Sequence, residues 1–465
     1  MRTRDAGRLA GLTGARLVGD AETMVGPDVV IDSRAATPGS LFVALPGEHA
    51  DGHDFVGRAA AAGAAAVLVS RESDVAVPQL VVPEVGAALA ALGTAVAAEA
   101  TEAGMVTVGI TGSSGKTSTK DLVAQILASA GETVAPIGSF NNEIGVPLTA
   151  TRVTPQTRFL VSELGARGQG HITWLCGIVP PQVGVVVNVG HAHLGEFGSV
   201  EAIAQAKGEL VEVLPQDGWA VLNADDPRVS AMRTRTVART ATFATTGEPA
   251  WGDLRVWASE VAADALQRPA FTLHAGPASA SVQLLVSGDH QVGNALAAAA
   301  VGLTQGLTVA EVAAALGTAR ARSHWRMELT ERPDGVLVVN DAYNANPDSM
   351  AAALRTLASL RRPGGRLLAV LGDMLELGPG APAEHRRTGT LAAELGVDAL
   401  IAIGAHAGDL AAGYGPATML VPSAEIAVEA ASAWLRPPDV VLVKASRGLA
   451  LETVAEQLSA VEGGR

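Results

Sequence analysis

A short stretch near residue 115 combines glycines, hydroxyls and one lysine at a spacing that suits phosphate chemistry. It reads Thr111-Gly112-Ser113-Ser114-Gly115-Lys116-Thr117-Ser118. The apolar run 105–110 before it predicts a buried parallel strand, and the apolar spacing within 121–130 predicts a helix. Glycines at such a junction let backbone N–H groups converge on phosphate oxygens, while the lysine reaches the terminal phosphates and the next hydroxyl can hold Mg²⁺.

The motif departs from the strict phosphate-loop pattern, because Ile110 stands where the first glycine belongs. What remains is T-G-x-x-G-K-T. The alternative is an ordinary strand-to-helix turn with a chance lysine. Because both flanking elements fit, we interpret the stretch as an ATP or GTP site.

A carboxylate follows the next strand predicted along the chain. Residues 158–161 form an apolar run that ends in Ser162-Glu163. In nucleotide-binding sheets, ligands gather at the carboxyl ends of strands, so Glu163 could hold Mg²⁺ directly or through water. The alternative is a strand-end charge that water solvates.

Two histidines and a lysine lie further along. His191 and His193 follow a predicted strand at 182–189, and no cysteine or H-x-x-x-H partner for zinc accompanies them. By themselves they are polar loop residues. Lys207 lies in a predicted helix at 199–214, where by itself it is a charge on the helix surface.

The composition limits the class of protein. The chain of 465 residues has 48% hydrophobic residues and a net charge of −14, which argues against nucleic acid as a partner. Cys176 is the single cysteine, so an internal disulfide is excluded, and its apolar surroundings predict a buried, inert thiol. The most apolar stretch, 85–98, is short and alanine-rich, which indicates a packed helix. With no secretory signal either, we expect a cytoplasmic protein without a membrane span.

The chain divides into three units, which we place at 1–103, 104–320 and 321–465. In the third unit, apolar runs alternate with helical patterns from residue 336 to the end, which predicts a parallel sheet with helices on both faces. It lacks a G-x-G-x-x-G fingerprint, so this Rossmann-like unit is not expected to bind a dinucleotide. In the first unit, Ser33 and Arg34 beside a turn could bind a pyrophosphate, or could be a surface turn with a solvated arginine.

Several of these stretches together resemble the Mur ligases, ATP-dependent enzymes that build the peptide stem of bacterial peptidoglycan. The resemblance rests on the T-G-x-x-G-K-T loop and on Ser162-Glu163-Leu164-Gly165-Ala166, Ala192-His193-Leu194, Ala206-Lys207-Gly208-Glu209, and His290 with Asn294. His193 and Lys207 are 14 positions apart, a spacing that the family shares. The resemblance covers essentially the whole chain, and it implies an α/β fold of three domains: an N-terminal α/β domain for a uridine-linked substrate, a central P-loop ATPase-like parallel-sheet domain and a C-terminal Rossmann-like domain.

The resemblance also implies roles for residues. Lys116, Glu163, His193 and Lys207 would be catalytic, and residues 112–118 would cradle ATP. Thr117 and Glu163 would hold one Mg²⁺. His193 and Lys207 would serve a second, with Lys207 carbamylated into an anionic oxygen ligand of the kind that Mg²⁺ prefers.

Further roles follow from the same resemblance. Asn294 would meet the adenine, and Arg326, Asp341 and Asn344 would contact the nucleotide from the third domain. The uridine-linked substrate would be contacted by Ser33, Arg34, Asn141 and Asn142. One departure is visible, because the family usually has glycine after the lysine of the last strand and here Ala445 follows Lys444; this leaves the roles of Lys444 and Ser446 open.

Within the family, the chain is most similar to the branch that joins D-alanyl-D-alanine to UDP-N-acetylmuramoyl-tripeptide through an acyl phosphate. The discriminating segments are 140–147, 341–350 and 371–378, and the D-N-P-R motif of the ligases that add a diamino acid is absent. We expect a monomer. Another stem-peptide ligase, a folylpolyglutamate synthase-like ligase and a non-enzymatic nucleotide switch are the alternatives. A separate first unit argues against the folate enzyme, and the joint match of His193, Lys207 and Asp341 argues against the switch.

Overall fold

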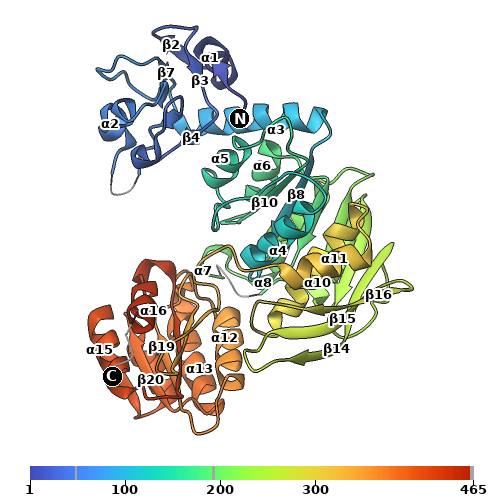
Figure 1. The fold of residues 1–465 in the computed structure, drawn as a ribbon, viewed down its shortest axis with the longest axis vertical. Helices are drawn as coiled ribbons and strands as arrows, with labels where there is room; N and C mark the ends of the chain where they lie inside the picture. Colours follow the sequence, from blue (N-terminus) through green and yellow to red (C-terminus); the bar gives the residue numbers. More distant parts are fainter. Residues whose placement is uncertain (48–49, 191–193, 461–465) are drawn as a thin grey trace.

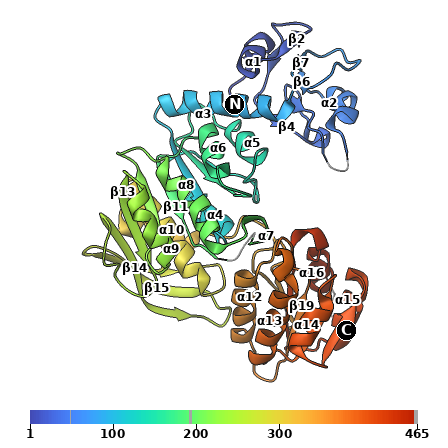
Figure 2. The ribbon, with the colours of Figure 1, turned by 180° about the vertical axis from the view of Figure 1, so that it is seen from behind.

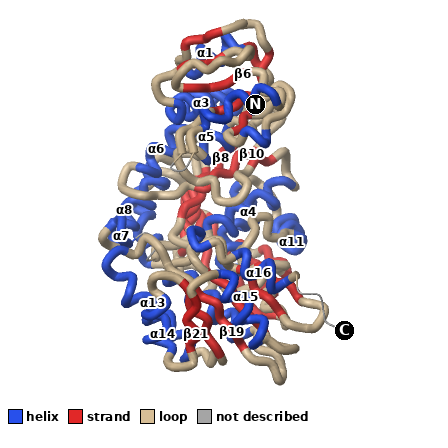
Figure 3. Tube along the Cα trace, turned by 90° about the vertical axis from the view of Figure 1, so that its left-hand side faces the viewer, coloured by secondary structure: helices blue, strands red, loops and turns tan. Residues whose placement is uncertain are grey.

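The computed structural model describes residues 1–47, 50–190 and 194–460 of the chain. These residues form three α/β units, with the amino-terminal unit at one end of the molecule and the carboxyl-terminal unit at the other (Figure 1). The same order is visible from behind and from the side (Figure 2, Figure 3). None of the described helices is both long and apolar enough to cross a membrane.

The amino-terminal unit contains a five-stranded sheet in the order β2-β7-β6-β5-β4, in which only β2 runs antiparallel to its neighbour. Side chains of β6 alternate between two apolar clusters, as expected for a strand buried on both faces. Its elements are β1 (Arg4–Asp5), α1 (Ala6–Thr13), β2 (Arg16–Val18), β3 (Met24–Val25), β4 (Val29–Val30), η1 (Ser33–Ala35), β5 (Leu41–Val43), η2 (Gly52–Phe55), α2 (Val56–Ala61), β6 (Ala66–Val69) and β7 (Gln79–Val81).

The 18-residue helix α3 (Val85–Glu102) lies between the first and second units (Figure 1). It packs against α1 on one side and against α5 and α6 of the central unit on the other. One apolar cluster therefore runs from Leu9 and Leu41 through Leu89 to Val146 and Leu175. The first two units share a core through this helix.

The central unit contains a nine-stranded sheet in the order β16-β15-β14-β13-β12-β11-β8-β10-β9, parallel from β9 to β14 and antiparallel from β14 to β16. Helices α4, α10 and α11 cover one face, and α5, α6 and α8 cover the other. Its strands are β8 (Val106–Thr111), β9 (Thr133–Val134), β10 (Phe159–Glu163), β11 (Val183–Val186), β12 (Trp219–Asn223), β13 (Arg239–Ala244), β14 (Leu254–Ala263), β15 (Pro269–Ala275) and β16 (Ala278–Gln283). Its helices are α4 (Lys116–Ala128), α5 (Gly145–Ala150), α6 (His171–Ile178), α7 (Leu194–Phe197), α8 (Val200–Glu212), α9 (Pro227–Ala231), η3 (Met232–Arg235), α10 (His290–Thr304) and α11 (Val309–Thr318).

The carboxyl-terminal unit contains a six-stranded sheet in the order β17-β18-β22-β19-β20-β21, parallel except for β17. Helices α12 to α14 cover one face, and α15 and α16 cover the other. Its elements are β17 (Glu328–Glu331), β18 (Leu337–Asn340), α12 (Pro347–Ser359), β19 (Leu367–Leu371), η4 (Gly378–Gly380), α13 (Ala381–Glu394), β20 (Ala399–Ile403), α14 (Ala407–Tyr414), β21 (Thr418–Val421), α15 (Ala424–Trp434), β22 (Val440–Lys444), η5 (Arg447–Leu449) and α16 (Glu452–Ser459). The predicted parallel sheet with helices on both faces is confirmed.

The segment 320–323, which joins the last two units, is fastened to the helix that follows the phosphate loop. The carboxylate of Asp121 accepts hydrogen bonds from the backbone N–H groups of Arg322 (3.0 Å) and Ser323 (2.9 Å). Lys120, only 1% exposed, pairs with Asp121 at 2.8 Å and donates to the Ser323 hydroxyl at 3.2 Å. These contacts fix the start of the third unit to helix α4.

Candidate active site

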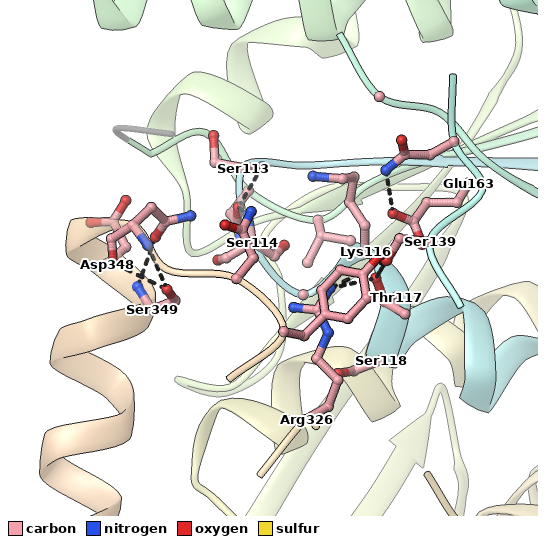
Figure 4. Close-up of a pocket in the computed structure, with 18 of the residues that line it drawn as sticks. Ser113, Ser114, Lys116, Thr117, Ser118, Ser139, Glu163, Arg326, Asp348 and Ser349 are labelled. Carbon is pink, nitrogen blue, oxygen red and sulfur yellow. Dashed lines mark hydrogen bonds between the residues drawn. The ribbon is translucent and has the colours of Figure 1, made fainter. Parts of the chain in front are cut away.

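A cavity of about 610 Å³ separates the central unit from the carboxyl-terminal unit. The phosphate loop and the ends of β10, β11 and β12 line one side, and residues after β18, β19 and β22 line the other. Figure 4 shows the loop residues Ser113 to Ser118 between Asp348 and Ser349, at the start of α12, and Arg326. The sequence-predicted edge of the sheet is thus one wall of an interdomain site.

The predicted phosphate loop lies between β8 and α4, as the sequence indicates. Two features require glycine at position 115. Its φ of +77° is a conformation that other residues rarely adopt, and a Cβ there would approach the Asn294 Oδ1 atom to 2.5 Å. The Asn188 side chain accepts hydrogen bonds from the N–H groups of Ser113 and Ser114, both at 3.0 Å. These are two of the N–H groups that could face phosphate oxygens.

Lys116 and Thr117 begin the helix. The Lys116 ammonium group donates to the Gly112 carbonyl oxygen at 2.8 Å, and burial lowers its pKa, an effect that the charge of Glu163 opposes. The Thr117 hydroxyl lies 2.8 Å from the Ser139 hydroxyl and accepts from Arg326 Nη2 at 3.2 Å. A cation and a hydroxyl thus lie next to one another where the resemblance expects the terminal phosphates and a metal ion.

Glu163 ends β10 and is 1% exposed. Its Oε1 atom accepts a hydrogen bond from the Asn141 side-chain amide at 2.8 Å, whereas its buried Oε2 atom has no hydrogen-bond partner within the described part of the chain. A buried polar oxygen left in this state costs free energy, so it needs a cation or donor that a ligand brings. The solvated strand-end alternative does not fit this geometry.

Lys207 is also buried, at 3% exposure, in the middle of α8. Burial lowers the pKa of its amine well below the usual value, and the charge of Lys116 lowers it further. It forms no hydrogen bond or ion pair with any residue that the structure describes. The helix-surface interpretation is therefore wrong. His193, its predicted companion, lies outside the described residues.

Metal-binding groups are sparse in the part of the chain that is described. No set of three or more histidine, cysteine or acidic side chains there could hold an ion by itself. Mg²⁺ usually binds through one or two carboxylates together with phosphates and water, so a site with one buried carboxylate and a hydroxyl still fits it. Glu163 and Thr117 offer those two oxygens.

Asn294 and Asn142, two further residues that the sequence singled out in the central unit, line the same cavity. The Asn294 side chain on α10 accepts from the Thr119 hydroxyl at 3.2 Å and donates to Gln291 at 2.9 Å. Asn142 lines the cavity and accepts from the N–H group of Gly145 at 2.9 Å. Both side chains are held by the protein at the cavity wall.

The carboxyl-terminal side carries a buried ion pair. Lys444 at the end of β22, 1% exposed, donates to Asp341 Oδ2 at 2.6 Å and to the Asn344 carbonyl oxygen at 2.8 Å. Burial lowers the pKa of Lys444, and Asp341 opposes that shift. Ser446 accepts from the N–H group of Leu375 at 2.9 Å. The two residues whose roles the sequence leaves open therefore hold the strand-end loops together.

Arg326 projects from the interdomain segment toward the phosphate loop (Figure 4). Its guanidinium lies 4.2 Å over the Tyr343 ring, and that ring stacks on Trp325 at 6.4 Å between centroids. Trp325 and Met327 both have positive φ, +59° and +51°, so the backbone on either side of Arg326 is strained. The sequence did not predict Tyr343 and Trp325 as site residues. Each is an aromatic residue directly before a predicted site residue, Asn344 and Arg326, and this position could have indicated them.

Some predicted residues lie elsewhere. Ser33 and Arg34 are in the amino-terminal unit and do not line this cavity. The buried Ser33 hydroxyl accepts from Arg58 at 2.7 Å, and the exposed Arg34 pairs with Asp32 at 2.6 Å. Cys176 is buried, and burial raises the pKa of its thiol to about 12, so the predicted inert thiol is confirmed.

Asn188 is a site residue that the sequence interpretation missed. It follows β11 directly, and the rule applied to Glu163, that ligands gather at carboxyl ends of strands, would have found it. Ser139, which contacts Thr117 and Arg326, lies in a loop without a comparable signal.

Comparisons with known proteins agree with this arrangement. Three family models match consecutive parts of the chain: the Mur ligase family, catalytic domain, at residues 28–108; the Mur ligase middle domain at 110–302; and the Mur ligase, glutamate ligase domain, at 325–447. A UDP-N-acetylmuramoyl-tripeptide–D-alanyl-D-alanine ligase of Mycobacterium tuberculosis is 48% identical, over 96% of each chain.

Two solved structures are similar along nearly the whole chain. MurF from Acinetobacter baumannii has a TM-score of 0.86 and 30% identity, and covers 99% of this chain and 100% of its own. MurF ligase from Thermotoga maritima in complex with ADP has a TM-score of 0.78 and 29% identity, over 93% and 97%. The predicted fold class and family are confirmed: the chain belongs to the Mur ligase family.

Proposed function

We propose that this chain joins D-alanyl-D-alanine to UDP-N-acetylmuramoyl-tripeptide in an ATP-dependent reaction, in the cytoplasm and as a monomer. The observation that carries the proposal is the 48% identity, over 96% of both chains, to a Mycobacterium tuberculosis enzyme that is named for this reaction. The cavity supports it, because three features converge there: a phosphate loop, an arginine from the next unit, and a buried carboxylate oxygen that no described residue contacts through a hydrogen bond.

The reaction has two steps. A carboxylate oxygen of the tripeptide attacks the γ-phosphorus of ATP, forming an acyl phosphate and releasing ADP. The amine of the dipeptide then attacks the acyl carbon, inorganic phosphate leaves, and the amine loses a proton. Both steps depend on positioning and on neutralising the charge that moves between oxygens.

Residues 112–118 would hold the phosphates of ATP. The N–H groups of Ser113 and Ser114 already donate to an oxygen of Asn188, so they point at an acceptor in a way that phosphate oxygens could use. Lys116 would exchange its Gly112 contact for the transferring phosphoryl group. Asn294 would meet the adenine, and Arg326, Asp341 and Asn344 would approach the nucleotide from the third unit.

Mg²⁺ would neutralise the phosphate oxygens and polarise the phosphorus under attack. Thr117 and Glu163 would hold one ion, and His193 with a carbamylated Lys207 a second. The buried Glu163 Oε2 atom, which has no hydrogen-bond partner among the residues placed by the structure, supports the first assignment. For the second, a buried lysine without a carboxylate partner, whose pKa is lowered, spends more time as the free amine that reacts with CO₂.

Carbamylation of Lys207 has a direct test. Native mass spectrometry at alkaline pH with added bicarbonate should show an additional 44 Da, approximately, that Lys207→Ala lacks. Small carboxylates with Mg²⁺ should partly restore activity to the alanine variant, because they return an anionic oxygen to the site. A fully active alanine variant would remove Lys207 from the mechanism.

We place the domain boundaries at 1–103, 104–320 and 321–465. The uridine-linked substrate would contact Ser33 and Arg34 in the first domain and Asn141 and Asn142 in the second. The decisive experiment measures phosphate release with ATP, Mg²⁺ and the tripeptide nucleotide while D-Ala-D-Ala, D-Ala, meso-diaminopimelate or L-lysine is offered. D-Ala-D-Ala should be used best. Faster turnover of a diamino acid with the dipeptide nucleotide as donor would assign the chain to another stem-peptide ligase.

A further inference from the structure

The cations that line the central cavity differ in how they are engaged. Five lysine and arginine side chains line it: Lys116, Arg167, Arg326, Lys444 and Arg447. Four of them contact an acceptor within the protein. Lys116 donates to the Gly112 carbonyl oxygen and Arg326 to the Thr117 hydroxyl. Lys444 donates to Asp341 and Arg447 to Glu452. The guanidinium of Arg167 contacts no acceptor among the residues that the structure describes. Its charge is therefore not engaged within the described part of the chain, and it is not one of the cations assigned to ATP above.

The backbone beneath Arg167 is fixed although its guanidinium is not. The N–H group of Arg167 donates to His171 Nδ1 at 3.2 Å, and His171 Nε2 lies 3.1 Å from a carboxylate oxygen of Glu143. Two positions earlier, the N–H group of Gly165 donates to the Asn141 carbonyl oxygen at 2.8 Å. The loop after β10 therefore presents an exposed arginine from an anchored main chain.

The spacing from Glu163 suits a peptide. Arg167 lies four positions after Glu163, and four residues of extended chain span at most about 14 Å. An extended dipeptide spans about 7 Å, which is within that limit, so the far carboxylate of a dipeptide whose amine reacts close to Glu163 has Arg167 within reach. A guanidinium matches a carboxylate with two parallel hydrogen bonds, which makes arginine suited to recognise one.

We propose that Arg167 binds a peptide carboxylate and so sets the substrate preference at this end of the cavity. This inference rests on the proposed function. The carboxylate has two sources with the same chemistry: the terminus of the acceptor dipeptide, or a carboxylate on the third residue of the donor stem. The Arg167 guanidinium would bind a carboxylate from either source in the same way.

The experiment compares acid and neutral versions of each substrate. The acceptor is D-Ala-D-Ala or its C-terminal amide, and the donor carries meso-diaminopimelate or L-lysine at the third position. KM and kcat are measured for wild type, Arg167→Ala and Arg167→Lys. Arg387→Ala serves as the matched control, because Arg387 is exposed, pairs with Glu384 and does not line the cavity.

A wild-type preference for one acid substrate that falls about 10-fold to 100-fold in Arg167→Ala, mainly through KM, supports the inference and identifies the source. Arg167→Lys should keep part of the preference. An unchanged preference in Arg167→Ala overturns the inference, as does an equal loss with all four substrate combinations. Failure of the wild type to use D-Ala-D-Ala would instead overturn the proposed function, so the two outcomes are distinct.

Discussion

Buried charges on the two sides of the cavity are in different states. On the central side, the buried groups are Glu163 and Lys207, of which only Glu163 lines the cavity. Among the residues that the structure describes, Glu163 Oε2 has no hydrogen-bond partner and Lys207 forms no ion pair. On the carboxyl-terminal side, Lys444 and Asp341 are 2.6 Å apart. Both sides are apolar and close-packed beneath the surface, so low exposure alone does not explain the contrast.

The difference separates groups that await a ligand from groups that hold the protein together. An unpaired buried charge lowers stability, and a protein retains it where a ligand later supplies the partner. A paired charge with further hydrogen bonds already has its partners within the protein, and removing one member of the pair leaves the other buried at the full desolvation cost. Substitutions on the two sides should therefore affect activity and stability in opposite proportions.

The largest expected effect is on stability, from Lys444→Met. The variant leaves Asp341 buried without its cation, which should lower the free energy of unfolding by about 3–5 kcal/mol. Urea titration followed by circular dichroism measures this. In the double variant Asp341→Asn with Lys444→Met, most of the loss should return, because neither charge is then left alone. A single variant as stable as wild type would show that the pair is not part of the scaffold.

Lys116→Ala should show the opposite pattern. Within the described part of the chain, the lysine donates only to a carbonyl oxygen of its own loop, so the unfolding free energy should change little. Loss of a cation aimed at the transferring phosphoryl group should raise the barrier by about 3 kcal/mol or more, at least 100-fold in kcat. Lys120→Met is the contrasting variant, because Lys120 lies one turn further along α4 and its contacts are structural. Normal turnover in folded Lys116→Ala protein would remove it from the site.

The sequence predicted the central side better than the other, for a physical reason. The phosphate loop lies within eight consecutive residues, and Glu163 follows from one strand end, so local pattern is enough. The pairing of Lys444 with Asp341 joins positions 103 apart, and the contact of Arg326 with Thr117 joins positions 209 apart. Such contacts depend on strand order and domain placement, which hydrophobic periodicity does not encode.

Some predictions about single side chains failed for a related reason. Lys207 reads as a surface charge by helical pattern alone, because a pattern does not show which face another element covers. The same limit applies to Arg386 and Arg387, which lie at the surface of α13 in ion pairs with Asp409 and Glu384. The family resemblance suggests a role for Lys207, and the structure shows that its side chain is buried.

A smaller effect should follow from removing the ring beneath Arg326. Tyr343→Leu deletes a cation–aromatic contact worth about 1–2 kcal/mol, so KM for ATP should rise about tenfold with kcat less affected. Tyr343→Phe keeps the ring and should behave nearly as wild type. Steady-state kinetics with varied ATP measure both. Equal damage from leucine and phenylalanine would assign the effect to the hydroxyl group and not to stacking.

The smallest effect on stability should come from Arg34→Ala, which tests a third condition: a charge satisfied at the surface. Arg34 pairs with exposed Asp32, and its hydrogen bonds lower the pKa of that carboxyl from 3.8 to about 2. Because folding lowers the pKa of Asp32, the pair stabilises the protein at pH values above the ordinary pKa of the carboxyl. This stabilisation is lost as the pH falls through the lowered pKa of the folded state. Any difference in melting temperature between wild type and variant should therefore be small at pH 7 and vanish near pH 2.

The same variant separates a substrate role from a surface role. If Arg34 binds the uridine-linked substrate, KM for the tripeptide nucleotide should rise several-fold while KM for ATP stays constant, because the cavity proposed for ATP does not include Arg34. Arg16→Ala is the matched control, since Arg16 is an exposed arginine of the same unit paired with Glu72. Unchanged KM for both substrates would leave Arg34 a solvated surface charge and place the uridine contacts elsewhere in the first unit.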